Sequence, residues 1–175
     1  VHTSLAIMDA IDALVPDEFA LYPQPDAESL RVAAHWADSE LQALSRTLLW
    51  GALRLAPHQA GVLAGRPPLD PALTDIVAAR TIEVAVAKHD VSFTRIGAAL
   101  ERLPVALDHL DRLVADGLIR IAPGELPNGA ELAVAPTLSL LAAVGDVRDE
   151  VLARPSAALI EIAPRRPGVI AAGAF

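Results

Sequence analysis

The stretch SFTRIGAALERLPVALDHLDRLVADGLIRIAPGELPNGAELAVA, residues 92–135, decides the fold that this sequence predicts. Its first half is typical of a short helix, a turn at Glu101-Arg102-Leu103, and a second helix with Pro104 in its first turn. The second helix carries Ala106, Leu110 and Leu113 at the i, i+4, i+7 spacing of one apolar helical face. We expect this helix to end at Asp116-Gly117, because glycine adopts the left-handed conformation that follows a helix at no steric cost.

Two short strands are expected after that glycine. Residues 118–121 have the alternation of a strand, residues 123–129 are rich in Pro, Gly and Asn, and residues 131–134 return as a second strand. Helix, turn, helix and hairpin is the element order of a winged helix. The predicted fold class is therefore mainly α with a small β-hairpin wing, preceded by an N-terminal helical region.

Two segments of this stretch resemble the winged helix-turn-helix family, which includes the bacterial regulators of the multiple-antibiotic-resistance type. TRIGAAL, residues 94–100, resembles the first helix of the motif, and LDRLVADGLI, residues 110–119, resembles the end of the second helix and the first wing strand. The resemblance covers about a quarter of the chain. It implies a DNA-binding transcriptional regulator, because the second helix of this family contacts base edges in the major groove.

A weaker resemblance leads to a different function. Residues 91–145 are similar to the second winged helix of the kleisin-associated accessory subunits of bacterial condensins, with Pro136-Thr137 after the wing and an apolar helix that ends in Val144-Gly145. This resemblance implies a protein-interaction or assembly module that does not bind DNA directly. In that alternative, Val105 and Leu107 form an exposed apolar patch that contacts the protein partner.

The charges of the stretch bear on the choice between these two functions. The candidate phosphate contacts are Arg95, Arg102, Arg112 and Arg120, but six carboxylates leave residues 92–135 with a net charge of −2. The whole chain is at −8, which repels nucleic acid unless a local basic patch exists. The expected major-groove positions hold no Arg, Asn or Gln, the residues that read guanine or adenine with two hydrogen bonds.

A long helix is expected to begin after Asp26. Its apolar residues recur at near-heptad spacing over roughly seven turns. They are Leu30, Ala34, Ala37, Leu41, Leu44, Leu48, Ala52 and Leu55. Trp36, Trp50 and Leu53 add apolar surface outside this stripe. Two interpretations follow: the helix packs on a second copy of the chain and makes a homodimer, or it is the spine of a single chain.

Proline and glycine divide the chain into three expected regions. Residues 58–69 have the composition of a linker, and Asp70-Pro71 is a strong start signal for the next helix. We expect an N-terminal helical region with a role in dimerisation at 1–66, a winged-helix domain at 67–153, and a C-terminal strand or arm at 154–175 with strand composition at 158–162.

Composition gives no sign of a catalytic or metal site. The chain is 53% hydrophobic with no cysteine, and its five histidines form no zinc-binding spacing. His109 lies beside Asp108 and Asp111, which we interpret as a solvated helical position rather than an acid–base pair. No long apolar run or signal peptide is recognised. We therefore expect a cytoplasmic protein that is not an enzyme, needs no cofactor and has no membrane span.

Overall fold

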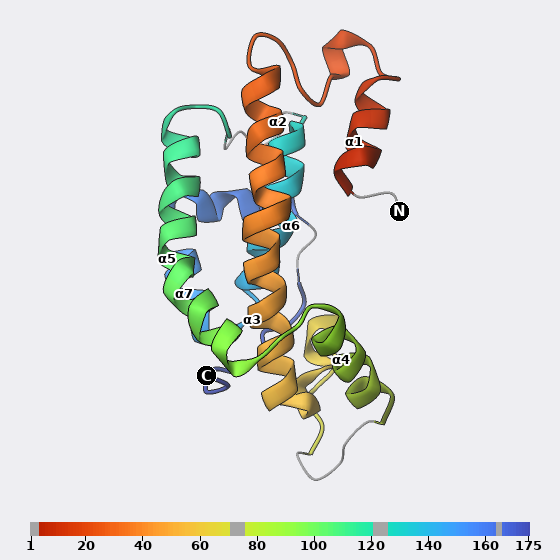
Figure 1. Ribbon diagram of the computed structural model, residues 1–175, viewed down its shortest axis with the longest axis vertical. Helices are drawn as coiled ribbons and strands as arrows, with labels where there is room; N and C mark the ends of the chain where they lie inside the picture. Colours follow the sequence, from red (N-terminus) through yellow and green to blue (C-terminus); the bar gives the residue numbers. More distant parts are fainter. Residues whose placement is uncertain (1–3, 71–75, 121–125, 164–165) are drawn as a thin grey trace.

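The computed structural model describes residues 4–70, 76–120, 126–163 and 166–175, and these residues are mainly helical (Figure 1). The α-helices of the described residues are α1 Ser4–Asp12, α2 Ala27–Trp36, α3 Gln42–Leu55, α4 Ile76–Lys88, α5 Phe93–Ala115, α6 Gly129–Leu141 and α7 Gly145–Leu152. Shorter helical segments are η1 Asp17–Phe19, η2 Ala37–Leu41, η3 Pro57–Gln59, η4 Val62–Ala64 and η5 Pro155–Ile162. The prediction of a mainly α protein is confirmed.

Helices α2 and α3 form one long rod, because the π-turn η2 joins them without a break (Figure 1). The predicted apolar stripe is buried along this rod from Leu30 to Ala52, and only its last member, Leu55, is 42% exposed. The rod packs against α4, α5 and α6 of the same chain. The stripe is therefore an intramolecular spine, and no second copy is needed to cover it.

The β-hairpin wing is not seen, so this part of the predicted fold class is wrong. The expected return strand, residues 131–134, lies inside α6, and residues 118–120 form a turn after α5. Residue 121 and residues 123–125 of the expected turn at 123–129 lie outside the described residues. The described residues form no sheet, and their one β-bridge joins Val144 to Ile170 in parallel.

The reason for this error is a helix start that resembles a turn. Asn128 caps α6 through its side-chain oxygen, which accepts a hydrogen bond from the Glu131 N–H at 2.9 Å. The Glu131 carboxylate in turn accepts a hydrogen bond from the Asn128 N–H at 2.8 Å. This reciprocal capping box begins a helix at the Asn-Gly pair that was interpreted as the end of a hairpin turn.

The helix-turn-helix is also absent, because α5 continues through the expected turn at Glu101-Arg102-Leu103. Pro104, expected to open the second helix, lies inside α5. The buried residues of α5 recur at intervals of three and four on both sides of this proline. They are Ile96, Ala99, Leu103, Leu107 and Leu110.

The buried face of α5 thus consists of five apolar residues: Ile96, Ala99, Leu103, Leu107 and Leu110. Because these residues stay on one face on both sides of Pro104, burying them favours one continuous helix over two helices joined by a turn. The loss of one backbone hydrogen bond at the proline is the cost of this continuity. The predicted end of the helix is confirmed, since Gly117 follows α5 with φ +74° and its N–H donates to the Val114 carbonyl at 3.0 Å.

The C-terminal segment differs from its prediction as well. Residues 158–162 belong to the 3-10 helix η5, not to a strand, and Leu159 of this helix is fully buried. The tail then returns to the body, where Ile170 donates its N–H to the Ala143 carbonyl at 2.9 Å. Buried residues of all three predicted regions join one hydrophobic cluster. The division at 66 and 153 stays a prediction.

We predict that Glu131→Ala lowers the free energy of unfolding by about 2–4 kcal/mol, because it leaves buried N–H groups without an acceptor. Glu131 is buried and also accepts hydrogen bonds from the Asn128 side chain at 2.9 Å and the Arg120 N–H at 2.7 Å. Urea denaturation followed by circular dichroism measures the change. Glu101→Ala, on the exposed face of α5, is the control. Equal effects of the two substitutions would contradict this role of Glu131.

Candidate functional site

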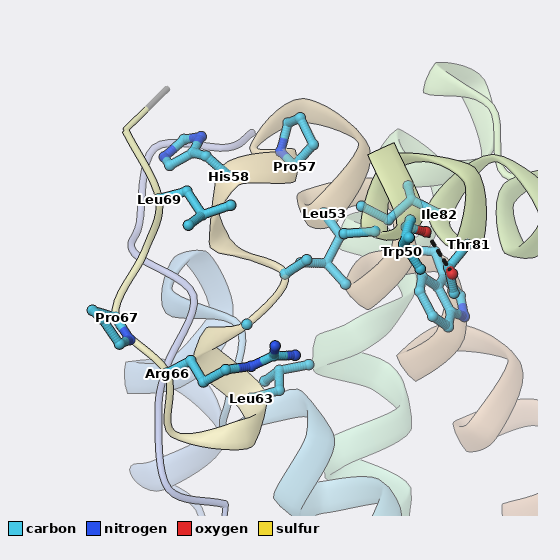
Figure 2. A pocket seen from close by; sticks show the side chains of 14 residues that line it. Trp50, Leu53, Pro57, His58, Leu63, Arg66, Pro67, Leu69, Thr81 and Ile82 are labelled. Carbon is cyan, nitrogen blue, oxygen red and sulfur yellow. Dashed lines mark hydrogen bonds between the residues drawn. The ribbon is translucent and has the colours of Figure 1, made fainter. Parts of the chain in front are cut away.

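A cleft of about 410 Å³ opens between the end of α3, residues 57–69 and α4 (Figure 2). We call it the α3–α4 cleft. Apolar side chains from all three segments form most of its wall. Its lining residues are Trp50, Leu53, Pro57, His58, Ala60, Gly61, Leu63, Arg66, Pro67, Leu69, Val77, Ala78, Thr81 and Ile82. A concave, mainly apolar cleft with a few polar groups is the usual form of a ligand site.

The segment expected to be a linker, residues 58–69, is a compact loop that closes on itself. The Leu69 N–H donates to the His58 carbonyl at 2.9 Å, which joins the two ends of the loop. Within it, the Arg66 N–H donates to the Gly61 carbonyl at 3.0 Å. Gly65 ends η4 with φ +73°, a conformation that favours glycine. Loops of this kind, whose ends lie close together, are often functional.

The C-terminal tail supports this loop from another side. The Ala171 N–H donates to the Gln59 side-chain oxygen at 2.6 Å. A Cβ atom on Gly168 would lie 2.4 Å from the Val62 carbonyl oxygen, so the tail and η4 are in close backbone contact. Residues far apart in sequence therefore hold the loop in position against the cleft.

The charge of the α3–α4 cleft differs from that of the whole chain. Arg66 lines it, together with His58, and none of its described lining residues is Asp or Glu. Figure 2 shows the Arg66 side chain extending from the loop into the cleft beside Leu63. The Thr81 hydroxyl donates to the Val77 carbonyl at 2.8 Å, within α4. The cleft thus combines apolar walls with a cationic group.

A second hollow of about 400 Å³ lies between the long rod and α5, and we call it the α5 groove. It brings together three of the predicted site residues, Arg102, Arg112 and Val105. Arg102 forms an ion pair with Glu40 of η2. Trp36 and His109 meet here edge to face, with ring centroids 4.5 Å apart. His109 is therefore partly buried against an aromatic ring and partly exposed in the groove.

The other predicted site residues lie outside this groove. Arg95 forms an exposed ion pair with Asp90 at 2.9 Å. Arg120 follows α5, and its backbone N–H donates to Glu131. Leu107 is fully buried, whereas Val105 is 65% exposed. The prediction that Val105 and Leu107 form one exposed patch is therefore wrong, because α5 turns them toward opposite environments.

Carboxylates interrupt the positive charges along α5. Arg95 and Arg102 each have an acidic partner, Asp90 and Glu40. Asp108 and Asp111, on the same helix, both form ion pairs with Arg154. The described residues of α5 thus offer no continuous positive strip for phosphates.

Comparisons of the chain with protein-family models, with curated proteins and with solved structures find no match. They do not test the winged-helix resemblance, which stays a prediction from the two quoted segments. In the described part of the chain, no group of three or more His, Asp or Glu side chains is arranged to hold a metal ion. No described helix has both the length and the hydropathy needed to cross a membrane.

Sequence reasoning did not predict the α3–α4 cleft, although one signal pointed to it. Trp50 and Leu53 lie outside the apolar stripe of the long helix, and both line the cleft. Trp36, also outside the stripe, lines the α5 groove. Apolar residues on a second face of a buried helix can indicate a cleft, but their spacing does not say which segment faces them.

We predict that the pKa of His109 lies below its ordinary value of 6.5, because partial burial and the nearby Arg112 disfavour its charged form. In a Trp50→Phe background, protonation of His109 should quench the fluorescence of Trp36 with a midpoint below pH 6.5. The folded protein binds this proton less readily than the unfolded chain, so lowering the pH through this range also lowers the free energy of unfolding.

The control for this titration is His109→Gln, which should remove the fluorescence transition. A transition that persists in this variant, or a midpoint above 6.5, would contradict the assignment.

Proposed function

We propose that this protein binds a small amphipathic molecule, with an apolar body and an anionic group, in the α3–α4 cleft. The observation that carries the proposal is the pairing of apolar walls with Arg66, in a cleft whose described lining residues include no carboxylate. In a chain of net charge −8, such a surface favours an anion locally. The guanidinium of arginine can hold a carboxylate with two parallel hydrogen bonds.

The apolar walls supply the remaining affinity. Leu53 and Ile82 are buried members of the wall, and Trp50 and Leu63 are partly buried beside them. Each methylene group of a ligand buried here contributes about 0.8 kcal/mol. Two added methylenes should therefore tighten binding by about ten-fold until the cleft is full.

DNA binding and a condensin-accessory role stay predictions, and both had depended on a winged helix. The described residues form neither its helix-turn-helix nor its wing. The ion pairs of Arg95 and Arg102 also leave fewer cations for phosphate contacts. Ligand binding in the cleft needs none of these elements, which is why we place it first.

We predict that decanoate binds at least about ten-fold more tightly than decanol, because a charge-assisted hydrogen bond contributes about 1.5–3 kcal/mol. The measurement uses a Trp36→Phe variant, in which Trp50 of the cleft is the remaining tryptophan and reports binding by its fluorescence. Arg66→Gln should remove the preference for the carboxylate and leave decanol binding unchanged.

The matched control is Arg80→Gln, which removes an exposed positive charge of α4 that does not line the cleft. It should leave the preference intact. Equal binding of decanoate and decanol by the unaltered cleft, or an equal effect of the two arginine substitutions, would contradict the proposal.

A further inference from the structure

Helix α4 presents apolar side chains to solvent on the side that faces away from the core. Ile76 and Val84 are 82% and 60% exposed, respectively. The buried residues of α4 are Ile82 and Ala85, on its opposite side. The helix packs mainly on α3 and η3, at one end of the molecule (Figure 1). Large apolar residues that are exposed on one side of a helix often mark an interaction surface.

The exposed side of α4 has a regular pattern. Four exposed residues recur along it at intervals of four, four and three: Ile76, Arg80, Val84 and Ala87. Such intervals place them in one line along a helix. Glu83 lies beside this line and is also exposed. We call this set the α4 outer face.

We propose that the α4 outer face binds the same face of a second copy of this chain, with the two helices antiparallel about a two-fold axis. In an antiparallel pair of helices, the residue numbers of any two residues that face each other have the same sum. The register that places Arg80 opposite the partner's Glu83 also places Ile76 opposite the partner's Ala87. One register therefore matches opposite charges and apolar side chains at the same time.

Charge complementarity favours a second copy as the occupant. A two-fold axis repeats every contact, so the pair of Arg80 with the partner's Glu83 occurs twice. Two copies of a chain at −8 repel each other over most of their surface. The α4 outer face carries one cation and one anion, so here the repulsion is replaced by attraction. This surface differs from the α2–α3 stripe of the earlier dimer prediction, which is buried within one chain.

Val84→Glu tests the surface, and Val105→Glu is its matched control. Val105, on α5, is 65% exposed against 60% for Val84, so both substitutions add one charge at a similar exposed valine. Sedimentation velocity over a range of concentrations should give a dimer for the unaltered chain and for Val105→Glu. Val84→Glu should be a monomer over the same range. A monomeric unaltered chain, or the same effect of both substitutions, would overturn the proposal.

A charge exchange tests the register without relying on Val84. Arg80→Glu places two glutamates opposite each other and should raise the dimer dissociation constant by about ten-fold or more. Adding Glu83→Arg restores opposite charges at both positions and should return the constant to within about three-fold of its original value. Failure of the double variant to restore the dimer, with its circular dichroism spectrum unchanged, would overturn this register.

Discussion

The capping box of Asn128 and Glu131 lies where the start of α6 meets the residue after α5 and the N-terminal loop. The Glu131 carboxylate accepts hydrogen bonds from Asn128 at the start of α6 and from the Arg120 N–H after α5. Gly129 follows the cap residue Asn128, and its N–H donates to the Leu21 carbonyl at 2.7 Å. A Cβ atom on Gly129 would lie 2.4 Å from the Tyr22 ring, so the N-terminal loop approaches closely here. The position of α6 depends on these contacts, because burying a polar group without its hydrogen bonds costs free energy.

Helix α6, once placed, provides the surface on which the other elements pack. It contacts α2, α3, η2 and η5, and most of its residues are buried. The long rod contacts it through α2, η2 and α3, and α5 packs on α3 of the rod. Helix α4 is different, since it contacts mainly α3 and η3 and buries fewer residues. The candidate cleft and the α4 outer face both lie at this more lightly packed end, away from the central contacts of α6.

Some features of the site could be predicted from sequence and others could not. Trp50 and Leu53 were recognised as apolar surface outside the main stripe, and both line the α3–α4 cleft. Arg66 gave no such signal, because a single arginine between Gly65 and Pro67 has no periodic pattern. Its place in the cleft depends on the hydrogen bond between Leu69 and His58, which closes the loop. Contacts between residues this far apart do not follow from local spacing.

The sequence by itself determined the helical character, the long apolar stripe from Leu30 to Ala52 and the end of α5 at Gly117, because each depends on local propensity or period. Tertiary structure decided whether Pro104 divides a helix and whether residues 131–134 extend as a strand. In both cases burial favoured the helix: Leu103 and Leu107 bury one continuous face, and Val134 lies fully buried within α6. Short apolar segments are compatible with either conformation, and the free energy of packing them against the rest of the chain makes the choice.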